Sequence, residues 1–263
     1  MISFFRKHLS LILFCLLIGQ IPPLCHSAEE VSADYILMLR FSEGDNAPVL
    51  TRTAARVLGQ NVSFARITQT MKFDKKTFTV GYDVKLSKAV RMASGMDVIT
   101  RVSSGVIEPE GWRGTYTLEQ RGSKSKTYSA QVDHALHKLT FFSDGELTNS
   151  EPTVPLLTDI NSLAFFWFGH PVKPQKVSLE VFDTKKLRHI ELDGQEVHYK
   201  VGIEVVKAVK FKRSILDKKD ANVEIVVRQE DGFPLAFEVD LSARYAVSGR
   251  FEIRKLPTLT YLN

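Results

Sequence analysis

The runs VKFKR (209–213), NVEIVVR (222–228) and LAFEVDL (235–241) decide the fold class. In the last run the apolar positions 235, 237, 239 and 241 alternate with an alanine, a glutamate and an aspartate. A period of two places one set on each face of a strand, which is typical of an antiparallel sheet with one solvated side. The stretch 177–256 therefore predicts a ladder of antiparallel strands.

The same alternation extends toward the N-terminus, most clearly at residues 78–86, where every second side chain is apolar. Aspartate-glycine pairs between such runs favour tight hairpins. They occur at Asp144-Gly145, Asp193-Gly194 and Asp231-Gly232. Many short strands at this spacing predict a mainly β fold, a single curved antiparallel sheet that is partly barrel-like.

One segment, residues 158–169, breaks the strand pattern. It begins with Thr158-Asp159, ends at Gly169 and is followed by Pro171, which are start and stop signals of a helix. Its apolar residues cover nearly the whole circumference. We therefore expect a short buried helix on the concave face of the sheet, and a second short helix at residues 49–58.

The N-terminus has the features of a secretory signal peptide. Two basic residues precede an apolar run at 9–21, and small residues follow, with cleavage after Ser27 or Ala28. The apolar run is too short to span a membrane, and no second hydrophobic segment follows it, so the mature chain is expected to have no transmembrane span. The predicted organisation is a signal peptide at 1–28 and a single mainly β periplasmic domain at 29–263, with an extracellular location as the second possibility.

Charge and cysteine content narrow the function classes. Lys+Arg total 35 and Asp+Glu total 30, and removing Arg6 and Lys7 with the signal peptide lowers the net charge from +5 to +3. Basic and acidic residues are interleaved, whereas nucleic-acid binding needs a concentrated basic face. Both cysteines, Cys15 and Cys25, lie in the predicted signal peptide. We expect no nucleic-acid partner, disulfide or thiol chemistry.

Catalytic and metal-binding patterns were not found in the sequence. It contains no Gly-x-Ser-x-Gly turn, phosphate-binding glycine loop or dinucleotide fingerprint. His134 and His137 have helical metal-ligand spacing, but in an expected strand this separation points the two rings to opposite faces. The prediction is a protein that is not an enzyme and binds no metal or cofactor.

Three stretches, residues 102–121, 158–163 and 209–253, together resemble the Gram-negative envelope family known as domain of unknown function 3108. The resemblance covers roughly Tyr35 to Leu256. It implies a signal-bearing periplasmic protein whose curved sheet is similar to lipoprotein-carrier folds, and it supplies no catalytic residues. The aromatic run at 165–168 departs from the plainer helix expected in that family. As fold-level analogy the resemblance favours binding of something apolar.

Aromatic residues are the candidate ligand contacts. Beneath the sheet they either pack as core, the commoner arrangement, or enclose a partly filled cavity for an acyl chain. The candidates are Phe165, Phe166, Trp167, Phe168, Trp112 and Tyr116.

The function predicted from these residues is binding of an apolar or amphipathic, lipid-like envelope component in a curved β-sheet by a non-enzymatic periplasmic protein. The alternative is a structural or adaptor protein with a fully packed interior, whose sheet edge or charged turns contact an envelope protein partner. A hydrolase acting on an envelope polymer is the third interpretation. The first interpretation requires an open interior, whereas the second requires a fully packed one.

Overall fold

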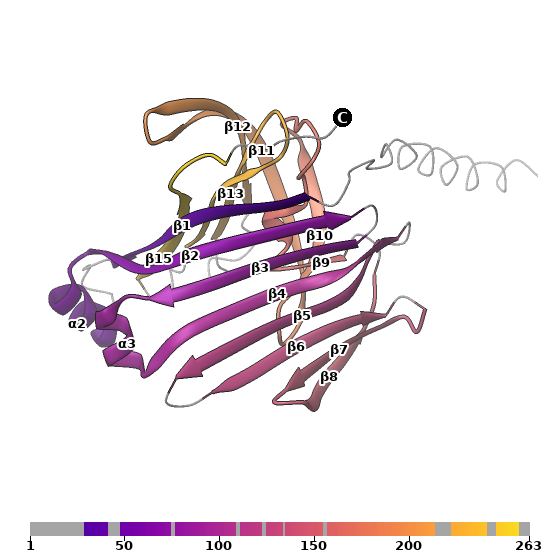
Figure 1. Ribbon diagram of the computed structural model, residues 1–263, viewed down its shortest axis with the longest axis horizontal. Helices are drawn as coiled ribbons and strands as arrows, with labels where there is room; N and C mark the ends of the chain where they lie inside the picture. The colour runs from indigo at the N-terminus through magenta and orange to yellow at the C-terminus, as the bar shows by residue number, and fades with distance from the viewer. Residues whose placement is uncertain are drawn as a thin grey trace, which may run out of the picture.

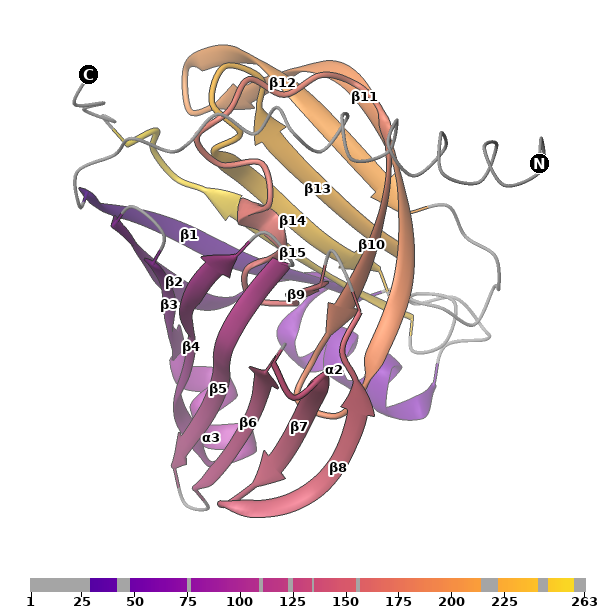
Figure 2. The ribbon, with the colours of Figure 1, turned by 90° about the vertical axis from the view of Figure 1, so that its right-hand side faces the viewer.

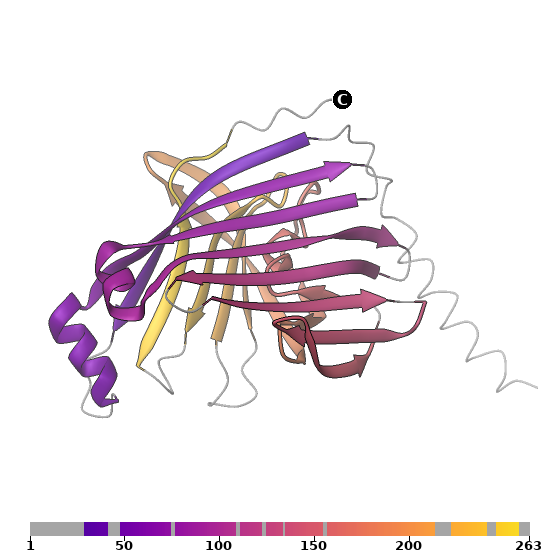
Figure 3. The same ribbon diagram turned by 60° about the horizontal axis from the view of Figure 1, so that its bottom comes forward.

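The computed structural model describes residues 29–41, 48–74, 77–108, 111–122, 125–133, 135–154, 157–213, 222–240 and 246–257. Successive strands of its first half form what we call the N-terminal wall. They are β1 (Glu29–Phe41), β2 (Asn61–Asp74), β3 (Thr77–Leu86), β4 (Met96–Glu108), β5 (Gly111–Gly122), β6 (Lys126–Asp133), β7 (Lys138–Ser143) and β8 (Glu146–Pro152). Two short helices, α2 (Val49–Leu58) and α3 (Lys88–Ser94), lie together at one end of this wall (Figure 1, Figure 3).

The second half of the chain forms the C-terminal wall. Its strands are β10 (Lys176–Phe182), β11 (Leu187–Val201), β12 (Glu204–Arg213), β13 (Asn222–Arg228), β14 (Pro234–Asp240) and β15 (Val247–Ile253). Between the walls lies the inner segment, residues 157–172, with the short strand β9 (Leu157–Asp159) and the 3-10 helix η1 (Leu163–Phe165) (Figure 2).

Within the described residues all strands belong to one fifteen-stranded sheet of order β8-β7-β6-β5-β4-β3-β2-β1-β15-β14-β13-β12-β11-β10-β9. Strands β1 and β15 pair antiparallel in the middle of this sheet, with Tyr35 opposite Ile253. The two walls are therefore joined by the first and last strands. Only the edge pair β9 and β10 is parallel among these strands. The predicted mainly β, antiparallel sheet is confirmed.

The chain connectivity explains why the sheet curls. Strands β8 and β9 are its two edges, yet only residues 153–156 separate them in the sequence. Laid flat, fifteen strands would span about 67 Å at a spacing of about 4.8 Å, whereas the link reaches at most about 18 Å. The walls must therefore face each other, as Figure 2 shows. Near the gap, Leu187 N donates to Glu151 Oε2 at 3.3 Å. The sheet is curved and partly barrel-like but not closed.

The core fills the concave side of this curl. In β3, alternate residues from Phe78 to Leu86 face inward, as the sequence predicts, and Val80 is only 1% exposed. Burying a large apolar side chain contributes roughly 1.5–3 kcal/mol, so the inward faces of both walls hold the inner segment between them. The largest fully buried aromatic side chains are Tyr116, Phe141, Phe182, Phe211 and Phe233.

The short buried helix is present, but its predicted extent from 158 to 169 is wrong. Thr158 and Asp159 lie in β9, where they pair with β10, and helical residues are limited to 163–165. The Asp159 carboxylate accepts the N–H groups of Asn161 and Ser162, two and three residues further on, but no long helix follows. At the other end, Gly169 N donates to Asp231 O at 2.8 Å. The bond from Gly169 is tertiary and the bonds to Asp159 are local, so neither continues an α-helix along the segment.

The three aspartate-glycine pairs have two different roles. Gly145 and Gly232 have φ of +85° and +69° and occupy turns between strands, as predicted. The hairpin predicted at Asp193-Gly194 is wrong, because both residues lie inside β11. A Cβ on Gly194 would lie 2.8 Å from Phe211 Cε1. This glycine is needed for close approach of a core ring and not for a turn.

Some predictions fall on residues that the structure leaves undescribed. The signal peptide at 1–28 and His134 lie outside the described residues. In the described part of the chain, none of the helices has the length and apolar character needed to cross a membrane.

Candidate functional site

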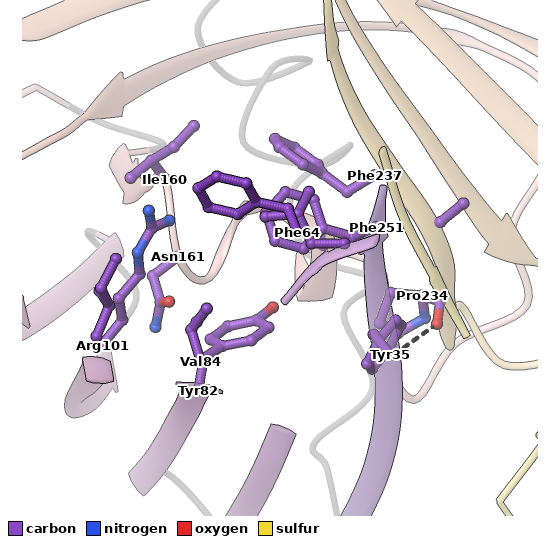
Figure 4. A pocket seen from close by; sticks show the side chains of 14 residues that line it. Tyr35, Phe64, Tyr82, Val84, Arg101, Ile160, Asn161, Pro234, Phe237 and Phe251 are labelled. Atoms are coloured by element: carbon purple, nitrogen blue, oxygen red, sulfur yellow. Dashed lines mark hydrogen bonds between the residues drawn. The ribbon is translucent and has the colours of Figure 1, made fainter. Parts of the chain in front are cut away.

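A cavity of about 180 Å³ lies between the two walls (Figure 4). Strands β1 to β4 line one side, β14 and β15 line the other, and the inner segment contributes Ile160, Asn161 and Ala164. An apolar cavity of about 150 Å³ stays dry and accommodates benzene. The space between the walls therefore has room for an apolar group of at least that size.

Strand alternation and register place the lining side chains. On β4, Ile99 and Arg101 are two residues apart and so share the inward face. They lie opposite Val84 and Tyr82 of β3 in the antiparallel ladder. Across the cavity, Phe237 of β14 and Phe251 of β15 are register partners with ring centroids 6.0 Å apart. The lining is mostly apolar, and its polar members come from the N-terminal wall and the inner segment.

A buried polar network anchors the inner segment to the N-terminal wall. The Ser103 hydroxyl donates to Asp159 Oδ1 at 2.8 Å, and the same oxygen accepts the backbone N–H groups of Asn161 at 2.8 Å and Ser162 at 3.0 Å. The Asn161 amide donates to Ser103 Oγ at 2.9 Å and to Val80 O at 3.2 Å. These bonds fix the turn that carries Ile160, Asn161 and Ala164 to the cavity.

The charged member of this network is fully buried. Burial raises the pKa of the Asp159 carboxyl above its ordinary range, although the hydrogen bonds from Ser103, Ser162 and Asn161 act to lower it. Its second oxygen, Oδ2, has no hydrogen-bond partner among the described residues. Because burial raises the pKa of this carboxyl, the free energy of unfolding depends on pH.

We expect Asp159→Asn to change how stability depends on pH. A folded-state pKa above the unfolded value means that the carboxyl favours folding most below the unfolded pKa, and that this contribution declines as pH rises through the folded pKa. Asparagine keeps an oxygen that accepts the same N–H groups but does not titrate. Urea unfolding from pH 4 to pH 8 should show the variant gaining stability relative to the wild type. If the free energies of unfolding of the variant and the wild type changed in parallel with pH, the burial of this carboxyl would be contradicted.

Arg101 is the charged residue of the cavity wall. Figure 4 shows its guanidinium beside Ile160 and Asn161, directed into the cavity. Its Nε is buried and donates to no acceptor in the described part of the protein. Burial raises the pKa of Tyr116 to about 12, and the charge of Arg101 opposes that rise. The guanidinium thus acts electrostatically on the interior of the sheet.

The structure places the predicted aromatic residues mainly in the core. Trp167 stacks on Phe211 with ring centroids 4.0 Å apart and an interplanar angle of 8°. Phe168 stacks on Phe73 at 5.3 Å, and Phe165 lies 6.4 Å from Tyr82. These rings join the inner segment to both walls. The cavity is lined by Ala164 of the same segment and not by these rings.

The other three candidates are separated from one another. Phe166 is 41% exposed and faces away from the core, although its ring contacts Trp167 at 5.3 Å. Tyr116 is fully buried in β5, opposite Ser103 of β4. Trp112 pairs with Ile107 in the ladder, and its side chain lies outside the described part of the structure. The five candidates whose side chains the structure describes therefore do not form a single site.

Sequence reasoning missed Arg101 and Asn161, although a signal for Arg101 exists. Arg101 lies midway between Ile99 and Ser103, so the period of two places its charge on the inward face of β4. A charged residue on such a face is unusual and points to a functional or structural partner. Asn161 has no comparable signal, because its position depends on the turn made by the inner segment.

No family model matches the sequence, and no curated protein matches it. Among solved structures, the chain is similar to a beta-barrel-like protein of domain of unknown function 1849 from Brucella abortus. The identity is 10% over 88% of this chain and 97% of that chain, with a TM-score of 0.45. This likeness carries no functional inference, and membership of the 3108 family stays a prediction.

Proposed function

We propose that the protein is a non-enzymatic periplasmic binding protein that holds the apolar part of an amphipathic envelope component between its two walls. The observation that carries the proposal is the cavity of about 180 Å³, lined mainly by apolar side chains. Small-molecule sites are typically concave and apolar with a few oriented polar groups. The predicted signal peptide and the resemblance to an envelope family support the periplasmic location.

The cavity size limits how much of a ligand it holds. If each water-sized group occupies about 30 Å³, the volume of about 180 Å³ accommodates a chain of roughly six carbons. Each buried methylene contributes about 0.8 kcal/mol, or roughly fourfold in affinity. A longer acyl chain would extend beyond the cavity, so the proposal concerns one segment of an amphipathic molecule.

Native mass spectrometry tests the proposal directly. The mature protein, purified from its own periplasm, should carry a copurified small molecule of defined mass that organic extraction releases. The same preparation after extraction should bind 1-alkanols in isothermal titration calorimetry. Affinity should rise roughly fourfold per methylene and level off once the cavity is full. An empty protein that binds no alkanol contradicts the proposal.

A cavity-filling substitution makes the test specific. Ala236 is 3% exposed and lines the cavity from β14. We expect Ala236→Leu, which adds three carbons at that position, to lower 1-octanol affinity by at least about tenfold, since it occupies the space of two or more ligand methylenes. Ala135→Leu, the same change at an exposed turn position, is the matched control and should leave affinity unchanged. Equal affinities for both variants would place the alkanol elsewhere.

A second candidate function is an adaptor that contacts another envelope protein. It is favoured by exposed apolar side chains on the paired end helices: Val57 of α2 is 76% exposed and Met92 of α3 is 79% exposed. A photo-crosslinker at position 57 should capture one defined envelope protein in cells if this function holds. Under this alternative the alkanol titrations show no binding.

A further inference from the structure

We propose that the ligand of the cavity is a monoanionic amphiphile whose carboxylate is held by Arg101. This inference rests on the proposed binding function and names its ligand class. It starts from the charged side chain among the described residues that line the cavity. This is the guanidinium of Arg101, which lines the concave face together with Ile99, Ile160 and Tyr82.

Arg101 lacks the partner that a partly buried cation normally has. Among the described residues, its buried Nε has no hydrogen-bond partner. None of the ion pairs between described residues includes Arg101. The interior carboxylate, Asp159, accepts its bonds through Oδ1 from Ser103, Asn161 and Ser162. Its Oδ2 and Arg101 Nε both lack partners, so the two groups are not bonded to each other.

Two other arginines of this sheet are paired with carboxylates of the protein. Arg250 donates to Glu238 Oε2 at 2.8 Å and to Glu252 Oε1 at 2.6 Å. The Arg188 Nη1 atom lies 2.6 Å from Asp183 Oδ2. A desolvated charge without a counter-ion is costly, and a bound anion would remove that cost at Arg101. The fork of guanidinium donors matches a carboxylate in a bidentate geometry.

The surroundings favour one negative charge over two. Among the described residues that line the cavity, Arg101 is the cation. The other polar groups nearby, which are the buried Asp159 and the hydroxyls of Tyr35 and Tyr82, carry no positive charge. A phosphate monoester carries about −1.5 to −2 at neutral pH, which would leave charge uncompensated in a poorly solvated site. A carboxylate is balanced by Arg101 alone, while the attached chain contacts Phe64, Phe237 and Phe251.

The test compares octanoate, 1-octanol and octyl phosphate, which share a chain and differ in the head group, by calorimetry on the full mature protein. The wild type should bind octanoate about tenfold or more tightly than 1-octanol, because charge-assisted hydrogen bonds are stronger than neutral ones. Arg101→Gln should abolish this preference. Arg66→Gln, at an exposed position on β2, two strands away from β4, is the matched control and should keep the preference.

The outcomes separate this inference from the function on which it rests. If octanoate and 1-octanol bind equally and Arg101→Gln changes neither, the carboxylate inference is overturned and the binding function stands. If octyl phosphate binds more tightly than octanoate, the monoanionic class is overturned. If none of the three binds the wild type, the proposed function itself fails.

A second measurement applies if Arg101→Gln does not fold. Salt screens an ion pair but not apolar burial. Raising sodium chloride should therefore weaken octanoate binding to the wild type and leave 1-octanol binding unchanged. An equal response of both ligands to salt overturns the inference.

Discussion

Trp167→Ala is expected to lower the free energy of unfolding by about 3–5 kcal/mol, the usual cost of deleting a large buried aromatic side chain. Trp167 is 7% exposed, and its ring stacks on Phe211 of β12 with centroids 4.0 Å apart. The deletion removes one of the contacts by which the inner segment packs against the C-terminal wall. Urea unfolding followed by circular dichroism measures the loss.

Two neighbouring substitutions serve as controls for this prediction. Trp167→Phe keeps an aromatic ring against Phe211, so it should cost clearly less than the alanine change. Phe166→Ala removes the next ring along the chain, but that side chain is 41% exposed and should cost little. A Trp167→Ala protein as stable as the wild type would contradict the core role of Trp167 and return it to the ligand candidates.

Gly232→Ala has the second large expected effect, a loss of about 2–5 kcal/mol. Gly232 has φ of +69°, and a Cβ at this position would lie 1.9 Å from the backbone oxygen of Trp167. The substitution thus combines an unfavourable backbone conformation with a steric overlap against the inner segment. Thermal unfolding should show a marked drop in midpoint.

Gly145→Ala is the matched control for the overlap. Gly145 has φ of +85°, but no atom lies within 4 Å of the position of its Cβ. It should therefore show only the backbone cost, about 1–2 kcal/mol. If the two variants lose equal stability, the inner segment does not pack against the β13–β14 turn as described.

Both predictions concern the same structural problem. A curled sheet alone leaves a hollow concave side, and close-packed interiors tolerate few voids. The inner segment fills most of that hollow through Trp167, Phe165 and Phe168. It leaves about 180 Å³ between Arg101 and the rings of Phe237 and Phe251. The aromatic cluster predicted as a ligand site thus supplies packing, and the cavity lies beside it.

Much of the fold was predictable because strands are indicated by the alternation of apolar and polar residues close together in the sequence. Alternation at 78–86 predicted β3 with its inward face, and Asp231-Gly232 predicted the turn before β14. Gly194 shows the limit of such reasoning, since an aspartate-glycine pair looks the same in a turn and in a strand that a distant ring approaches. The predicted extent of the helix at 158–169 was wrong for a similar reason. Ser103 donates to the Asp159 carboxylate, and Asp231 O accepts the N–H of Gly169, and both partners are distant in the sequence.

The sequence by itself determined a mainly β chain with alternating strands, its tight turns, and an aromatic segment that must be buried. Each of these follows from residues a few positions apart, where side-chain direction repeats every two residues along a strand. Only the tertiary structure decided that Ser103 meets Asp159 across 56 residues and that Arg101 faces Phe251 across a cavity. Those contacts depend on how far the whole sheet curls, which is set by the short link between its two edges and by the inner segment packed inside it.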